Sequence, residues 1–154
     1  MAIALGAVPY VGLLVAIFGT ALLWAMLAPA RQRQAVARLG AAPGWSFALG
    51  ALLWFPVALA LAWVLKTFGT GAHHGQGAMT LFLFFTGSAG FAVCARALGE
   101  RVVPEWSPLA QTLIGLAALV LPLFSLVGLP VLLIAAPLGL GAWLSAGKAR
   151  PSAP

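Results

Sequence analysis

Few side chains in this sequence could do chemistry, and the clearest pair is His73–His74. Neutral imidazole nitrogens can bind a metal or a tetrapyrrole cofactor. The pair lies in the Gly-rich stretch "KTFGTGAHHGQG", with no Cys, Asp or Glu nearby to complete a four-ligand site. We predict a solvated loop and no metal, which leaves His73 and His74 as cofactor-binding candidates only. The alternatives are a ligand shared with a partner chain and a pH sensor.

The carboxylates and the thiol are also expected to have structural rather than catalytic roles. Glu100 and Glu105 are the two acidic side chains, and a local salt bridge to Arg96 or Arg101 is the expected role, not a paired-carboxylate active site. Cys94 is the single cysteine and is expected to pack as a small hydrophobe. Gly-x-Ser-x-Gly, His-Glu-x-x-His and P-loop motifs are missing from the sequence. We therefore predict no catalytic residues and no enzyme.

The composition predicts that lipid surrounds most of the chain. Of the 154 residues, 63% are hydrophobic and 6% are charged, whereas soluble domains carry about 25% charged residues. The net charge is +6, but the bases are scattered between apolar blocks, so we expect no binding of nucleic acid. They are better interpreted as topology signals and as contacts to anionic lipid headgroups.

Apolar segments of this length predict an all-α fold, a polytopic membrane helix bundle of three spans plus a C-terminal helical hairpin. In lipid the backbone must satisfy its own hydrogen bonds, and the segments are too long and too uniformly apolar for barrel strands. The first segment lacks a basic region before it and is expected to be a retained span rather than a signal peptide. The expected spans are 2–27, 45–65 and 79–98, within a single transmembrane domain (1–147) followed by a short polar tail (148–154).

The C-terminal run is uncharged from Ser107 to Gly147, about twice the length that one span needs. We predict a hairpin, 109–124 and 129–144, that bends at Ser125–Pro130, where glycine and proline favour a chain reversal. It either spans fully or is re-entrant. The alternative is one long tilted helix.

The distribution of basic residues predicts the orientation. By the positive-inside rule, the first and third loops and the tail are cytoplasmic, and the His-His loop is outside. The N-terminus is then periplasmic and the C-terminus cytoplasmic, in a bacterial inner membrane. Arg96, near the cytoplasmic end of its span, is expected to extend to the headgroups. The basic residues concerned are Arg31, Arg33, Arg38, Arg96, Arg101, Lys148 and Arg150.

Small residues recur at helical spacing, which allows helix backbones to approach closely. We favour intramolecular packing over a dedicated subunit interface. The sets are Gly12, Ala16 and Thr20; Ser88 with Ala92; Gly90 with Cys94; and Ala135 with Gly139.

Three stretches together resemble the membrane region of bacterial bactofilin-type (polymer-forming) proteins: "RQAVARLGAAPGWSFALGALLWFPVALALAWVLKTFGTG", "GFAVCARALGERV" and "LIGLAALVLPLFSLVGLPVLLIAAPLGLGAWL". The shared features are a basic loop, a Pro-Gly helix start, an A-x-x-L-G-x-R exit and a Gly-rich final hairpin. The β-helical domain of that family is missing. The resemblance implies a bacterial inner-membrane module without known catalysis, and it assigns no functional residues.

These observations predict a non-catalytic accessory or structural subunit of a larger bacterial membrane complex, with a photosynthetic or respiratory complex as one host. Its partners would be the lipid bilayer and other membrane subunits, with no soluble substrate identified. No cofactor is predicted, although lipid or pigment contact is compatible with the spans. The alternatives are a lipid-acting enzyme that uses the residues above and a small oligomeric channel or transporter. The channel would be lined by Thr86, Ser88, Gln111 and Thr112.

Overall fold

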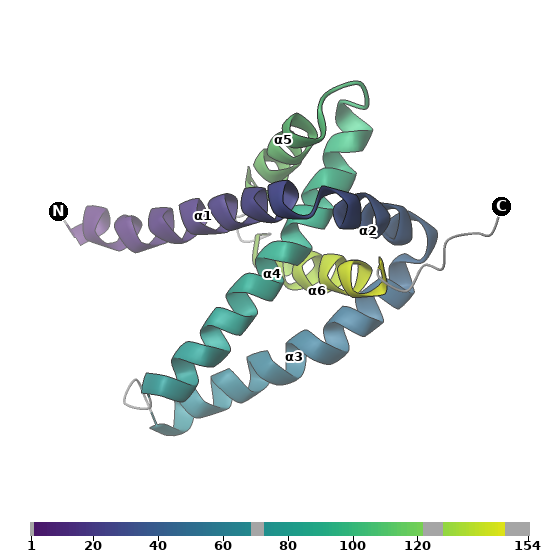
Figure 1. The fold of residues 1–154 in the computed structure, drawn as a ribbon. Helices are drawn as coiled ribbons and strands as arrows, with labels where there is room; N and C mark the ends of the chain where they lie inside the picture. The colour runs from purple at the N-terminus through teal and green to yellow at the C-terminus, as the bar shows by residue number, and fades with distance from the viewer. Residues whose placement is uncertain (1, 69–72, 122–127, 147–154) are drawn as a thin grey trace.

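The chain is all-α and forms a helical bundle (Figure 1). A computed structural model describes residues 2–68, 73–121 and 128–146, and these hold no strand. The predicted fold class is therefore confirmed. The helices are α1 (Ala2–Leu27), α2 (Pro29–Ala41), α3 (Pro43–Phe68), α4 (His73–Val102), α5 (Pro108–Val120) and α6 (Gly128–Ala146).

Proline marks where three of the helices begin. Pro29, Pro43 and Pro108 each occupy the first turn of a helix, where the missing N–H is not needed. The Ser107 hydroxyl accepts a hydrogen bond from the Ala110 N–H at 3.4 Å and caps α5. The single residue Ala28 separates α1 from α2, and the chain bends there by 103°.

Two segments expected to be loops are helical, and both expectations were wrong. The basic stretch that contains Arg31, Arg33 and Arg38 forms α2, because its few apolar residues lie on one face that can be buried. His73 and His74 begin α4 rather than lying in a loop, since the helix continues about a turn and a half beyond the apolar segment. Their side chains lie outside the described part of the structure.

α6 lies between α3 and α4, which diverge from one end of the molecule (Figure 1). Glycines allow the backbone of α6 to lie very close to the backbones of α3 and α4. A Cβ added to Gly50 would overlap the backbone oxygen of Pro137, and one added to Gly139 would overlap the backbone of Gly90. Gly141 meets the backbone of Ser46 in the same way. The predicted small-residue positions on α4 and α6 therefore serve intramolecular packing.

The C-terminal run contains two helices, but their arrangement differs from the expected hairpin. α5 and α6 each pack on α4 and share few contacts with each other. The reason is that their glycines face α4: Gly115 meets the backbone of Ala95, and Gly139 meets Gly90. Gly128–Pro130, expected within the bend, form the first turn of α6. Residues 122–127, which hold the rest of the predicted bend, lie outside the described residues.

Among the described residues, two helices are long and apolar enough to cross a membrane, α3 and α4 (residues 75–102), or three if the bent α1–α2 pair counts as one span. The chain is thus a membrane protein by the length and composition of its helices. The 13 residues of α5 rise only about 20 Å. That length is less than the hydrocarbon thickness of about 30 Å, so α5 is too short to cross alone.

Candidate functional site

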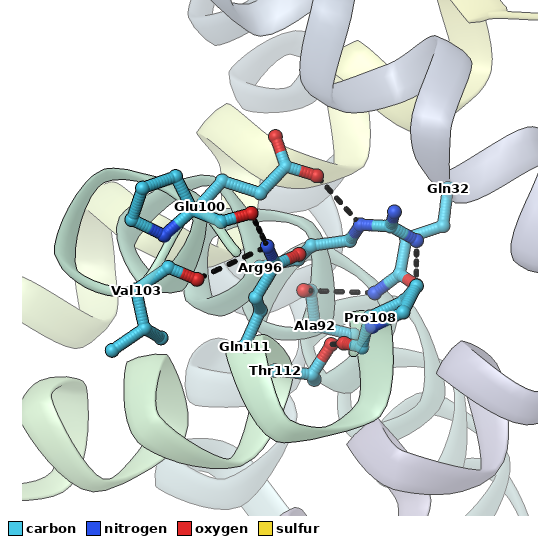
Figure 2. A network of polar contacts seen from close by, with 9 residues as sticks. Gln32, Ala92, Arg96, Glu100, Val103, Pro108, Gln111 and Thr112 are labelled. Atoms are coloured by element: carbon cyan, nitrogen blue, oxygen red, sulfur yellow. Dashed lines mark hydrogen bonds and ion pairs between the residues drawn. The ribbon is translucent and has the colours of Figure 1, made fainter. Parts of the chain in front are cut away.

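Arg96 is the centre of a buried polar network between α2 and α4 (Figure 2). The residue is 3% exposed. Its Nε donates to the Glu100 Oε1 at 2.9 Å, one helical turn along α4, and its Nη1 donates to the Gln32 Oε1 at 3.2 Å. The expected salt bridge of Glu100 is therefore confirmed. The expectation that Arg96 extends to the headgroups was wrong, because this guanidinium has partners inside the protein.

Gln32 joins α2 to α4 in this network. The residue is 1% exposed. While its amide oxygen accepts from Arg96, its Nε2 donates to the Ala92 backbone oxygen at 3.1 Å (Figure 2). An amide is suited to this position because it presents an acceptor to the cation and a donor to the carbonyl.

Gln32 was not among the predicted site residues, although the sequence holds a signal for it. Gln32 is spaced three, four and seven residues before Ala35, Val36 and Leu39. This spacing is typical of the inward face of an amphipathic helix. A polar residue on that face needs a buried partner. The spacing did not identify the partner, which lies 64 residues away in the chain.

Gln111 and Thr112 lie beside the network at the start of α5 and stabilise the connection from α4 (Figure 2). The Gln111 Nε2 donates to the backbone oxygens of Val103 and Pro104 at 3.2 and 3.0 Å. The Thr112 hydroxyl donates to the Pro108 oxygen at 2.8 Å. These bonds satisfy carbonyls near the end of α4 and within the first turn of α5.

The two hydroxyls on α4 that were expected to line a channel make similar local bonds. Thr86 donates to the Phe82 oxygen at 2.6 Å, and Ser88 donates to the Phe85 oxygen at 2.9 Å. Thr86, Ser88, Gln111 and Thr112 therefore all donate to nearby backbone oxygens, as polar side chains in apolar helices commonly do.

The other predicted chemical groups are dispersed. Among the described residues, no three of the His, Cys, Asp and Glu side chains lie close enough to hold a metal ion. Glu105 is exposed in the connection between α4 and α5. Cys94 is buried, and its Sγ lies 3.3 Å from the Ala135 backbone oxygen, so it packs as a small residue as expected.

A second contact joins α1, α2 and α6 near the network. The guanidinium carbon of Arg31 lies 5.2 Å from the ring centroid of Trp143. Trp24 meets the same indole edge-on, with 5.4 Å between the ring centroids. Cation–π and edge-to-face geometries are both favourable, so the first contact holds α2 against α6 and the second holds α1 against α6.

Trp54 on α3 borders a cavity of about 240 Å³ between α3 and α4. The residue is 8% exposed, and its Nε1 is buried without a hydrogen-bond partner in the described part of the structure. The cavity is otherwise mostly apolar, with Leu61, Leu83 and Phe84 among its lining.

The network can hold helices together, but it brings no nucleophile or base to a cleft. Its one cation is paired with a carboxylate, and its amide uses both its oxygen and its nitrogen. The arrangement is thus that of a structural polar core. No protein-family model, curated protein or solved structure matches this chain.

Proposed function

We propose that this chain is a non-catalytic integral membrane protein that serves as a structural or accessory subunit of a larger bacterial membrane assembly. The supporting observation is the contrast between its interior and its outer surface. The buried polar groups around Arg96 bind one another, whereas the outer faces of the helices carry large apolar side chains.

α3 has the more exposed apolar surface of the two candidate spans, α3 and α4. Only 11% of its most apolar stretch is buried within the protein. Leu52, Leu59 and Trp63 are 74%, 69% and 62% exposed. Lipid tails solvate such a face, and so can another apolar helix that packs against it. The resemblance to the membrane region of bactofilin-type proteins, which implies no catalysis, stays a prediction and agrees with this proposal.

Site-specific photo-crosslinking in native membranes tests this proposal. A photoreactive amino acid at Leu59, on the exposed face, should give crosslinks to other membrane proteins. The same residue at Leu116, which is 0% exposed, is the matched control and should crosslink only within the chain. A free monomer after mild extraction, with no crosslink from Leu59, Leu52 or Trp63, would contradict the proposal.

A small oligomeric channel or transporter is the alternative function. It would need polar groups free to face a pathway, and the four side chains expected to line one donate instead to backbone oxygens. Flux measurements in proteoliposomes distinguish the two. Movement of an ion or solute that depends on Ser88 or Thr112 would favour the channel.

A further inference from the structure

A cavity of about 460 Å³ opens where α2 ends, α3 begins and α6 ends. Each of the three helices contributes a different kind of side chain. α2 supplies a cation, α6 supplies a hydroxyl, and α3 supplies mostly apolar side chains. The lining residues used below are Arg38, Leu49, Leu53, Leu144 and Ser145.

Among the described residues, Arg38 gives this cavity a positive charge that no carboxylate pairs with. The whole chain has two carboxylate side chains. Glu100 is bonded to Arg96, and Glu105 lies in the connection after α4. Within residues 2–68, 73–121 and 128–146, Arg96–Glu100 is the one ion pair. Arg38 is exposed in this structure, so its guanidinium is free to bind an anion from outside the chain.

The cavity continues as an apolar groove along α3. Leu49 and Leu53 are one turn apart on the same face, and Leu144 of α6 lines the same cavity. Leu53 is 44% exposed, so the groove opens to the surroundings of a helix that is apolar enough to cross a membrane. A free inorganic anion would leave these leucines uncovered, whereas a hydrocarbon chain would cover them.

The bend between α1 and α2 matches the depths of Arg38 and of the apolar groove to the headgroup and acyl-chain layers of a bilayer. α2 turns by 103° from α1, so when α1 crosses the membrane, α2 lies along its surface. Arg38 then lies at headgroup level. Since α3 begins just after α2 and is apolar enough to cross the membrane, Leu49 and Leu53 lie progressively deeper along it. Basic pockets at the ends of membrane helices have the chemistry to bind anionic lipid headgroups.

We infer that this cavity binds one anionic phospholipid, with its phosphate against Arg38 and one acyl chain along Leu49, Leu53 and Leu144. The Ser145 hydroxyl, whose proton is donated to the Ala142 oxygen at 3.0 Å, still offers its oxygen as an acceptor to a headgroup hydroxyl. This lipid site is independent of the protein partners proposed above, so either proposal can fail without the other.

Native mass spectrometry of the purified full chain, titrated with phosphatidylglycerol or phosphatidylcholine, tests the site. The wild type should retain one phosphatidylglycerol more tightly than any phosphatidylcholine. Arg38→Gln should weaken phosphatidylglycerol binding about fivefold, the effect of one basic side chain at an anionic surface. Arg33→Gln is the matched control, because Arg33 is exposed on the same helix but does not line the cavity.

A second variant tests the groove without changing charge. Ser145→Phe places a ring in the cavity and should displace the lipid, while circular dichroism confirms that the helices persist. Excess inorganic phosphate should not displace the lipid. Equal losses in Arg38→Gln and Arg33→Gln would show a diffuse electrostatic attraction and overturn the site. Unchanged binding in Ser145→Phe, or displacement by phosphate alone, would overturn the acyl-chain groove.

Discussion

Replacement of Gln32 by leucine tests whether the buried network holds α2 on the bundle. Leucine has a similar volume and favours the helix, so packing is largely kept while both hydrogen bonds are lost. The bond from the Arg96 guanidinium, at 3.2 Å, involves a charged group and contributes about 1.5–3 kcal/mol. The bond to the Ala92 oxygen, at 3.1 Å, is neutral and adds about 1 kcal/mol. We therefore expect Gln32→Leu to lower the free energy of unfolding by about 2.5–4 kcal/mol.

The assay is equilibrium unfolding in mixed detergent and sodium dodecyl sulfate micelles, followed by tryptophan fluorescence. Trp143 and Trp24 are suitable reporters, since they lie where α2 meets α6 and α1. Gln34→Leu is the matched control. Gln34 lies on the same helix but is exposed, so its replacement should change the free energy by no more than about 0.5 kcal/mol.

A double-mutant cycle with Arg96→Met identifies the partner. Removing Arg96 leaves Glu100, whose side chain is 36% exposed, free to be hydrated. In that background the Gln32 oxygen has already lost its donor, so Gln32→Leu should cost less than in the wild type by about 1.5–3 kcal/mol. The Gln32–Arg96 bond contributes nothing to stability if Gln32→Leu is no more destabilising than Gln34→Leu, or if the effects of Gln32→Leu and Arg96→Met are additive.

Three other positions give independent tests. Gly90→Ala should lower the melting temperature, because its Cβ would overlap a backbone oxygen of α6 at a cost of about 1–3 kcal/mol or more. Gly77→Ala is the control and should leave the melting temperature unchanged, because its Cβ meets open space. Equal melting temperatures of the two variants would contradict the close contact at Gly90. Trp54→Phe should change the free energy of unfolding by under about 1 kcal/mol, since the lost N–H has no partner in the described part of the structure, whereas Trp54→Ala should cost about 3–5 kcal/mol. A large loss in the phenylalanine variant would mean that the indole N–H is bonded. Ser152→Cys should react with an impermeant thiol reagent only from the cytoplasm, with buried Cys94 silent, and labelling from the periplasm alone would refute the predicted orientation.

Hydropathy alone was enough to predict the helical class and the positions of most helices. The predicted first span, 2–27, coincides with α1, and α3 and α4 extend beyond the predicted 45–65 and 79–98. The lengths of α3 and α4 were underestimated because polar and small residues continue a helix beyond its apolar part. For α2 the interpretation was wrong for a related reason. A stretch rich in arginine and glutamine was taken for a loop, although its apolar residues have helical spacing.

For the predicted site residues, the sequence indicated partners within one helix but not partners on another helix. Glu100 was expected to pair locally, and it does, because its partner lies one helical turn away on the same helix. Arg96 was expected to extend to the headgroups, because it lies near the cytoplasmic end of its predicted span. Gln32 instead provides a buried acceptor from a different helix.

The sequence by itself determined the environment of this protein and most of its helices. Both follow from properties of single segments, because lipid requires a long apolar stretch to satisfy its backbone internally, and a helix does so. The tertiary structure alone decided which segments meet. It placed α5 and α6 separately on α4 through their glycines, and it enclosed Arg96 between Glu100 and Gln32. Such contacts depend on shape and bonding between residues far apart in the chain, which hydropathy does not record.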